Sequence, residues 1–162
     1  MRIQKKRRKQ GKTDYKLRLI LLKSGIPRVV IRKTNRYIIV QLVKSNEAQD
    51  KVISGVTSKD LLKHGWGKNF SGSLKSTPAS YLTGLLMAKK IKNKEKVILD
   101  LGMQKTIKGN KIYAVVKGLV DGGVNLNTGK GIFPSEERLN GEHLKPELKS
   151  IIKSVREKLK WK

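Results

Sequence analysis

The stretch RVVIRKTNRYIIVQLV, residues 28–43, contains two runs rich in β-branched residues, separated by a short polar junction. Such runs favour β-strands, and Asn35 at the junction tolerates the positive φ angles of a tight turn. The stretch therefore predicts an antiparallel hairpin of strands 28–34 and 37–43. A similar run at residues 51–57 follows a polar turn, which extends the hairpin to a three-stranded meander.

Downstream of the meander, the sequence alternates between helical and strand patterns. Thr77 is the expected N-cap of a helix with Pro78 at its first position, and Asn110 caps another whose apolar residues recur at helical spacing. Buried and edge strands are predicted at 97–101 and 124–127. Because a helix that joins two strands of one sheet implies a parallel, right-handed crossover, the chain is predicted to be an α/β protein. Its mixed five-stranded sheet has the predicted order 3-2-1-4-5, with helices packed against it.

Residues 1–36 hold an unusual concentration of positive charge. They contain fourteen Lys and Arg against one acid, a net +13, which is half of the chain's formal +26. Like charges at this density repel one another and destabilise a compact state until a polyanion neutralises them. A phosphate-rich partner is therefore the leading hypothesis.

Within this segment, residues 1–12 have almost no apolar side chains. They are predicted to form a basic disordered tail that becomes ordered on its partner. Thr13 is the expected N-cap of a short helix, with Leu17, Ile20 and Leu21 on one face. The remaining parts are a single α/β domain at residues 13–145, which includes this helix, and a C-terminal helix at residues 146–162.

Composition narrows the class of protein further. A pI near 10.5 is typical of proteins that bind nucleic acids. No apolar run approaches the roughly 18 residues of a membrane-spanning helix, which argues against a membrane partner. The absence of cysteine removes disulfides, thiol catalysis and Cys-ligated zinc, and fits a reducing compartment. The basic N-terminus lacks a secretory apolar core, so a cytoplasmic protein is expected.

Aromatic residues near the basic segment have two interpretations. Tyr15 and Tyr37 either stack on bases or riboses, or pack against the domain. Trp66 and Phe70, in a glycine-rich loop, either form a second RNA contact with Lys68 or fold against the sheet.

Several stretches together resemble one known family. They are GKTDY (11–15), PRVVIRKTNR (27–36), YLTGLL (81–86), GNKIYA (109–114), KGLVDGG (117–123) and PSEERL (134–139). These matches run in order from about residue 5 to residue 145. The chain resembles the 5S rRNA-binding large-subunit ribosomal protein numbered eighteen, in its archaeal and eukaryotic-type form.

This resemblance implies a ribonuclease-H-like topology without catalysis, and a location in the cytoplasmic ribosome. The implied role is to bind 5S rRNA and attach it to the large-subunit rRNA in the central protuberance. Other large-subunit ribosomal proteins are further expected partners, whereas no cofactor, metal or small-molecule substrate is expected.

The residues expected to contact RNA are mostly arginines and lysines of the basic segment. Arginine is favoured because its planar guanidinium grips phosphate with two hydrogen bonds and stacks on unpaired bases. Arg28 and Arg32, four residues apart on one strand, are expected to point outward from a shared face. The full set is Arg2, Lys5, Lys6, Arg7, Arg8, Lys9, Lys12, Thr13, Tyr15, Lys16, Arg18, Arg28, Arg32, Arg36, Tyr37 and Lys68.

Two other classes of protein compete with this interpretation. A ribonuclease-H-like nuclease needs several carboxylates around paired metal ions, and only Asp100 and Asp121 end neighbouring elements. A general DNA-binding protein also fits the charge, although no recognition-helix or zinc-finger pattern is present. His64 and His143 lack partners at metal-ligand spacing.

Overall fold

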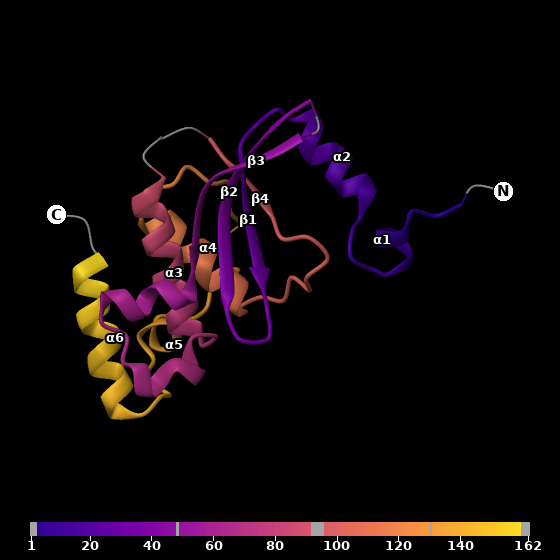
Figure 1. Ribbon diagram of the computed structural model, residues 1–162. Helices are drawn as coiled ribbons and strands as arrows, with labels where there is room; N and C mark the ends of the chain where they lie inside the picture. The colour runs from indigo at the N-terminus through magenta and orange to yellow at the C-terminus, as the bar shows by residue number, and fades with distance from the viewer. Residues whose placement is uncertain (1–2, 48, 92–95, 130, 160–162) are drawn as a thin grey trace.

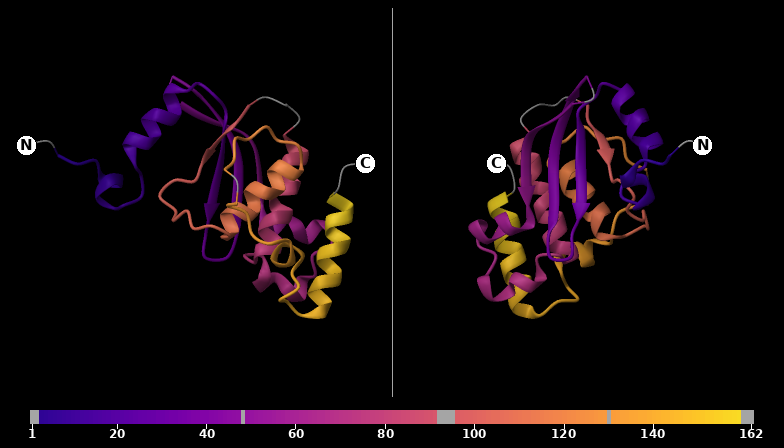
Figure 2. Two further views of the ribbon diagram at one scale, coloured as in Figure 1. Left: turned by 180° about the vertical axis from the view of Figure 1, so that it is seen from behind. Right: turned by 45° about the vertical axis from the view of Figure 1, so that its right-hand side comes forward.

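A mixed β-sheet separates the N-terminal segment from the other helices (Figures 1 and 2). Helices α3 (Thr77–Lys90) and α4 (Lys111–Asp121) cover one side of this sheet, and helices α1 (Lys6–Lys9) and α2 (Tyr15–Lys23) lie on the other. The structure, a computed structural model, describes residues 3–47, 49–91, 96–129 and 131–159.

The predicted meander is confirmed. The strands are β1 (Arg28–Lys33), β2 (Ile38–Asn46), β3 (Gln49–Thr57) and β4 (Ile98–Asp100). Strands β1 and β2 pair antiparallel, with Arg28 opposite Val43 and Lys33 opposite Ile38, and β3 pairs antiparallel with β2. Strand β4 pairs parallel with β1, so the order in the sheet is 3-2-1-4. Val29 and Ile31 are fully buried towards α3 and α4, as period-two alternation requires.

The fifth strand was predicted wrongly, because the described residues form a sheet of four strands. Among the described residues, one backbone hydrogen bond joins residues 124–127 to the segment of β4, from the Val97 N–H to the Asn125 carbonyl at 3.2 Å. Val124 is buried as an edge strand would require. A single bond anchors this segment but does not form a ladder, so the five-stranded ribonuclease-H-like topology is not confirmed.

Helix starts follow the predicted chemistry with small shifts. The side chain of Asn110 caps α4 by accepting hydrogen bonds from the backbone N–H groups of Ile112 and Tyr113. Helix α3 is capped by Ser76, not by Thr77 as predicted, so Pro78 occupies the second helical position. Serine fits this position because its hydroxyl accepts the hydrogen bond from the Ala79 N–H at 3.4 Å.

Helices α3 and α4 cross at an unusually short distance. A Cβ atom added to Gly84 would overlap the carbonyl oxygen of Val115, and one added to Gly118 would overlap that of Tyr81. Glycine in a helix costs stability in isolation, but here it lets two backbones touch.

Beside the crossing, the Tyr81 hydroxyl donates a hydrogen bond to the Asp121 carboxylate at 3.0 Å. Burial of the hydroxyl and the charge of Asp121 raise the pKa of Tyr81 to about 12.

The segment between β3 and α3 contains two 3-10 helices, of which the second lies within the predicted glycine-rich loop. These are η1 (Ser58–His64) and η2 (Lys68–Ser73). Trp66, between them, is only 1% exposed, and its indole N–H donates to the Phe70 carbonyl at 3.2 Å. The alternative in which Trp66 contacts RNA is therefore wrong, since its ring packs in the core.

The C-terminal part contains α5 (Glu136–Asn140) and the amphipathic helix α6 (Pro146–Leu159). The apolar face of α6 includes the buried side chains of Leu148, Ile152 and Val155. Within the described ranges, no helix combines the length and apolar character needed to span a membrane.

We predict that Gly118→Ala lowers the free energy of unfolding by about 1–3 kcal/mol, because the new methyl group overpacks the crossing of α3 and α4. Denaturant unfolding followed by circular dichroism measures this loss. Gly72→Ala is the matched control, because a Cβ there meets no atom within 4 Å. Equal stability of the two variants would contradict the close crossing.

Candidate nucleic-acid interface

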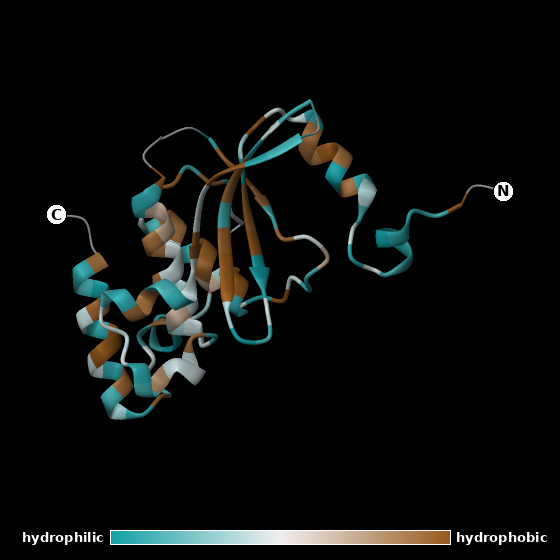
Figure 3. Ribbon diagram, viewed as in Figure 1, coloured by the Kyte–Doolittle hydropathy of each residue, from teal (hydrophilic) through white to brown (hydrophobic). Residues whose placement is uncertain are grey.

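The N-terminal segment exposes most of its charge. Helix α1 and the residues on either side of it bury no side chain, and Figure 3 shows this helix as hydrophilic throughout. None of the ion pairs found among the described residues involves a cation between positions 3 and 17. The exposed predicted contacts here are Lys5, Lys6, Arg7, Arg8, Lys9, Lys12 and Lys16.

A few contacts order the junction between α1 and α2. The Arg7 Nε donates to the Thr13 hydroxyl at 2.9 Å, and the Lys5 ammonium lies 4.6 Å from the centre of the Tyr15 ring. The N-cap of α2 is Asp14, whose carboxylate accepts from the N–H groups of Lys16 and Leu17, and not Thr13 as predicted. A carboxylate is favoured at this end of a helix by the helix dipole.

Helix α2 has no buried residue. Ile20, which was predicted on a face with Leu17 and Leu21, is 58% exposed, and Leu19 is exposed as well. Burial of apolar side chains therefore contributes little to holding α2 in place, and polar contacts must contribute more.

Those contacts form a chain of alternating charges from α2 to the sheet. The carboxylate of Asp50, on β3, pairs with Arg18 of α2 at 2.9 Å and with Arg28 of β1 at 2.6 Å. Arg28 also lies 3.7 Å from the carboxylate of Asp100, at the end of β4, and Arg32 pairs with Asp100 at 2.8 Å. We call these five side chains the ion-pair network.

The network corrects the expectation for Arg28. Arg28 and Arg32 do share a face, since both reach Asp100, but Arg28 is 3% exposed and does not point into solvent. Two carboxylates, one from β3 and one from β4, compensate the buried guanidinium, which would otherwise be too costly to desolvate. Arg32 is partly exposed and also donates to the Asp100 carbonyl at 2.7 Å.

Electrostatics at Asp50 reflect this arrangement. Partial burial by itself raises the pKa of the Asp50 carboxyl, but a hydrogen bond from Ser45 and the guanidinium groups of Arg28 and Arg18 outweigh it. The pKa of Asp50 therefore lies below its ordinary value of 3.8. The carboxylate is held in its charged form.

Other predicted contacts lie away from α1 and α2. Arg36 is exposed at the tip of the β1–β2 hairpin, and beside it Tyr37 is half-buried under the Lys59 ammonium, 5.1 Å from the ring centre. Lys68 is exposed at the start of η2. The hairpin tip is the far end of β1 from α2, so the structure does not bring the predicted set into one patch (Figure 1). Arg2 lies outside the described residues.

The acids that organise the site are not identified by the sequence patterns. Those patterns predict Asp50 only as a turn residue and Asp100 only as a possible nuclease ligand. One signal was available: both lie at strand ends in a chain with only 12 acids against 38 cations.

A nuclease centre is not assembled. Asp100 is engaged by Arg28 and Arg32, whereas Asp121 pairs with Lys117 at 2.8 Å and accepts from Tyr81. Across the part of the chain that the structure describes, no three His, Asp or Glu side chains are grouped closely enough to hold a metal. Asp100 and Asp121 are therefore both engaged in contacts that hold the fold together.

We call the exposed basic residues 3–17 the cationic leader. A four-stranded α/β domain with this leader defines a basic protein without an assembled catalytic cluster among its described residues. Comparison with known families gives the particular one. A family described as "Ribosomal large subunit proteins 60S L5, and 50S L18" matches residues 1–97. The chain belongs to this family.

Curated relatives extend the match over most of the chain. The Large ribosomal subunit protein uL18 of Methanoregula boonei is 44% identical over 141 residues, which cover 86% of this chain and 79% of the relative. The protein of the same name from Korarchaeum cryptofilum is 46% identical over 144 residues, covering 86% and 70% respectively. The sequence prediction of a large-subunit ribosomal protein, and not an enzyme, is confirmed. Its location is the ribosome of the cytoplasm.

We predict that Asp50→Asn lowers the free energy of unfolding at neutral pH by about 1.5–3 kcal/mol, the range for a hydrogen bond to a charged group. Because the pKa of Asp50 is depressed in the folded state, its stabilisation is fully present above about 3.8 and is lost as the pH falls through the lower folded value. The wild-type and Asp50→Asn curves should therefore converge below pH 4.

Denaturant unfolding between pH 3 and pH 7 tests this convergence. Glu142→Gln is the control, since Glu142 is exposed and takes part in none of the ion pairs of the described residues. A stability difference for Asp50→Asn that is the same at every pH would contradict the role of its charge.

Proposed function

We propose that this protein binds 5S rRNA and attaches it to the large-subunit rRNA in the central protuberance, beside other large-subunit ribosomal proteins. The observation that carries the proposal is the exposed cationic leader, whose lysines and arginines at positions 3–17 form no ion pair with any carboxylate of the described residues. Membership in a large-subunit ribosomal family supports it.

The leader suits folded RNA for electrostatic reasons. Each Lys or Arg that neutralises a phosphate releases condensed counterions, and this release drives association most strongly at low salt. Helix α1 is too short to be stable alone, which leaves the leader free to follow the shape of an RNA groove.

Arginines of the leader supply more than charge. Arg8 is exposed, and its planar guanidinium can hold one phosphate with two hydrogen bonds or stack on an unpaired base. Arg7 is held towards Thr13 at the junction with α2, so its position is partly set before RNA arrives. Tyr15, under the Lys5 ammonium, offers a stacking surface at the same junction.

The ion-pair network fixes the position of α2, to which the cationic leader is attached. Arg18 and Arg28 are engaged by Asp50, which leaves them little freedom to reach outward to RNA. We therefore assign Arg28 to positioning α2, and the exposed residues before it to direct phosphate contact. Arg32, partly exposed at the edge of the network, serves both purposes.

Competition separates a 5S rRNA-binding protein from a general basic nucleic-acid binder. Labelled 5S rRNA is bound to the protein at a fixed salt concentration, and unlabelled 5S rRNA or duplex DNA of equal length is added. We expect 5S rRNA to compete at a far lower concentration, because contacts fitted to folded RNA add to the non-specific charge term. Equal competition by duplex DNA would refute the proposal.

Deletion of residues 1–12 is predicted to leave the melting temperature nearly unchanged, because the described residues in this range are all exposed. It should remove most of the affinity for 5S rRNA and lower the slope of log affinity against log salt, by roughly one for each phosphate that the shortened protein no longer binds. Filter binding over a salt series and thermal unfolding measure the two effects.

A charge-matched pair of variants controls for the loss of charge alone. Lys6→Gln/Arg8→Gln/Lys9→Gln removes three positive charges from the leader, and Lys44→Gln/Lys145→Gln/Lys153→Gln removes three from exposed lysines elsewhere. The first should weaken binding much more than the second. If both weaken it equally, the leader has no special part in binding.

A further inference from the structure

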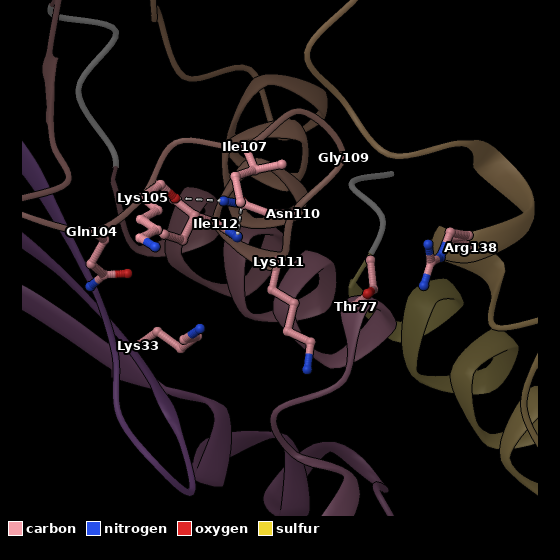
Figure 4. A pocket seen from close by; sticks show the side chains of 10 residues that line it. All are labelled: Lys33, Thr77, Gln104, Lys105, Ile107, Gly109, Asn110, Lys111, Ile112 and Arg138. Atoms are coloured by element: carbon pink, nitrogen blue, oxygen red, sulfur yellow. Dashed lines mark hydrogen bonds between the residues drawn. The ribbon is translucent and has the colours of Figure 1, made fainter.

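A second group of cations surrounds a cavity of about 480 Å³ at the start of α4 (Figure 4). Its positive side chains come from four separate elements: Lys33 ends β1, Lys105 lies in the loop before α4, Lys111 begins α4, and Arg138 belongs to α5. In Figure 4, Lys33 and Lys111 extend into the same open space, and Arg138 and Thr77 border it on another side. Residues distant in sequence thus converge here.

This convergence is electrostatically unfavourable without a ligand. Within the described ranges, none of the four cations has a carboxylate within 4.0 Å. Burial, and then the charges of Lys75, Lys33 and Arg138, lower the pKa of the Lys111 ammonium. An anion in the cavity would relieve this repulsion.

The charge of the cavity comes from side chains more than from the end of the helix. The N–H groups of Ile112 and Tyr113 are already bonded to the Asn110 side chain. The Asn110 amide also donates to the Lys105 carbonyl at 3.0 Å, which fixes the loop that carries Lys105 against α4. The cap therefore shapes the wall of the cavity and leaves the four cations to meet a ligand.

The loop before α4 also connects this cavity with the leader. Gly102 and Met103 line a smaller hollow together with Arg7 and Lys12, whereas the next residues of the same loop line the cavity at α4. The two cationic regions are thus neighbours on either side of one loop. A single RNA segment, or two that meet there, would contact both.

We propose that the cavity formed by Lys33, Lys105, Lys111 and Arg138 binds a backbone phosphate of RNA, as a contact separate from the cationic leader. This rests on the proposed function and adds to it a second point of attachment. Arg138 can hold two phosphate oxygens at once, and the lysines add point charges around the remaining ones. RNA is favoured over an acidic protein segment because the chain belongs to a large-subunit ribosomal family and because the loop that lines the cavity also lines the hollow beside Arg7 and Lys12 of the cationic leader.

The double variant Lys33→Gln/Lys111→Gln tests this proposal in the full-length protein. Its charge-matched control is Lys44→Gln/Lys145→Gln, which changes exposed lysines outside the cavity. We expect the cavity variant to bind 5S rRNA or large-subunit rRNA roughly tenfold more weakly than the control. The magnitude of its salt slope should also fall by about one, because the cavity is proposed to hold one phosphate.

Failure of this proposal differs from failure of the proposed function. If the wild-type protein binds neither RNA, both fall together. If it binds RNA and the cavity variant binds as the control does, the phosphate site is refuted and the proposed function stands. Loss of binding through misfolding is checked by thermal unfolding, where Lys111→Gln should be no less stable because it relieves repulsion.

Two further measurements identify the occupant. Inorganic phosphate, titrated at constant ionic strength and followed by amide NMR, should shift Lys111 and Ile112 in the wild type but not in the cavity variant. Acylation of Lys33 and Lys111 should be blocked by bound RNA. Shifts with phosphate but no change in RNA affinity would indicate a small-anion site and overturn the proposal, as would protection by polyglutamate but not by RNA.

Discussion

Two carboxylates, Asp50 and Asp100, belong to the ion-pair network that holds α2 against the sheet, and the cationic leader is attached to the sheet through α2. They are placed where Arg18, Arg28 and Arg32 would otherwise repel one another, and each bridges two of these guanidinium groups. Helix α2 buries no side chain of its own, so its position depends on this alternation of charge. Such a network fixes the geometry of its members more than it raises the free energy of unfolding, because the desolvation of the buried charges offsets much of their mutual attraction. Its consequence is that the leader starts from a defined point on the domain.

The domain itself keeps charge out of its interior. Among the described residues, Arg28 is the single charged side chain that is fully enclosed, and the rest of the core is apolar or carries small hydroxyl groups. The protein can therefore fold with a net charge of +26, because its repelling groups lie at the surface, where water and salt screen them. The same separation leaves the cations free for an anionic partner.

The sequence predicted those features that depend on local chemistry. The β1–β2 hairpin follows from two runs rich in β-branched residues on either side of a short polar junction, although Asn35 does not adopt the positive φ angle expected of it. The start of α4 follows from the capping side chain of Asn110. It did not predict the burial of Arg28, because that depends on acids brought in by β3 and β4. The fifth strand failed for a related reason: the composition of residues 124–127 suits an edge strand, but pairing is decided by neighbours that the pattern does not contain. The exposure of Ile20 on α2 was not predicted, because helical spacing does not show whether a surface exists against which an apolar face can pack.

The cavity at α4 is a feature that the local sequence pattern does not predict. None of its cations stands out in the sequence, where lysine and arginine are spread along most of the chain. Only the fold makes Lys33, Lys111 and Arg138 neighbours, and it does so through the close crossing of α3 and α4, which sets where α4 begins relative to the sheet. Gly84 and Gly118 belong to stretches by which the chain resembles its family, and neither lines the cavity. A glycine that allows two backbones to touch thereby also determines the spacing of charges at the surface, so packing in the core and recognition of a polyanion are linked through one helix.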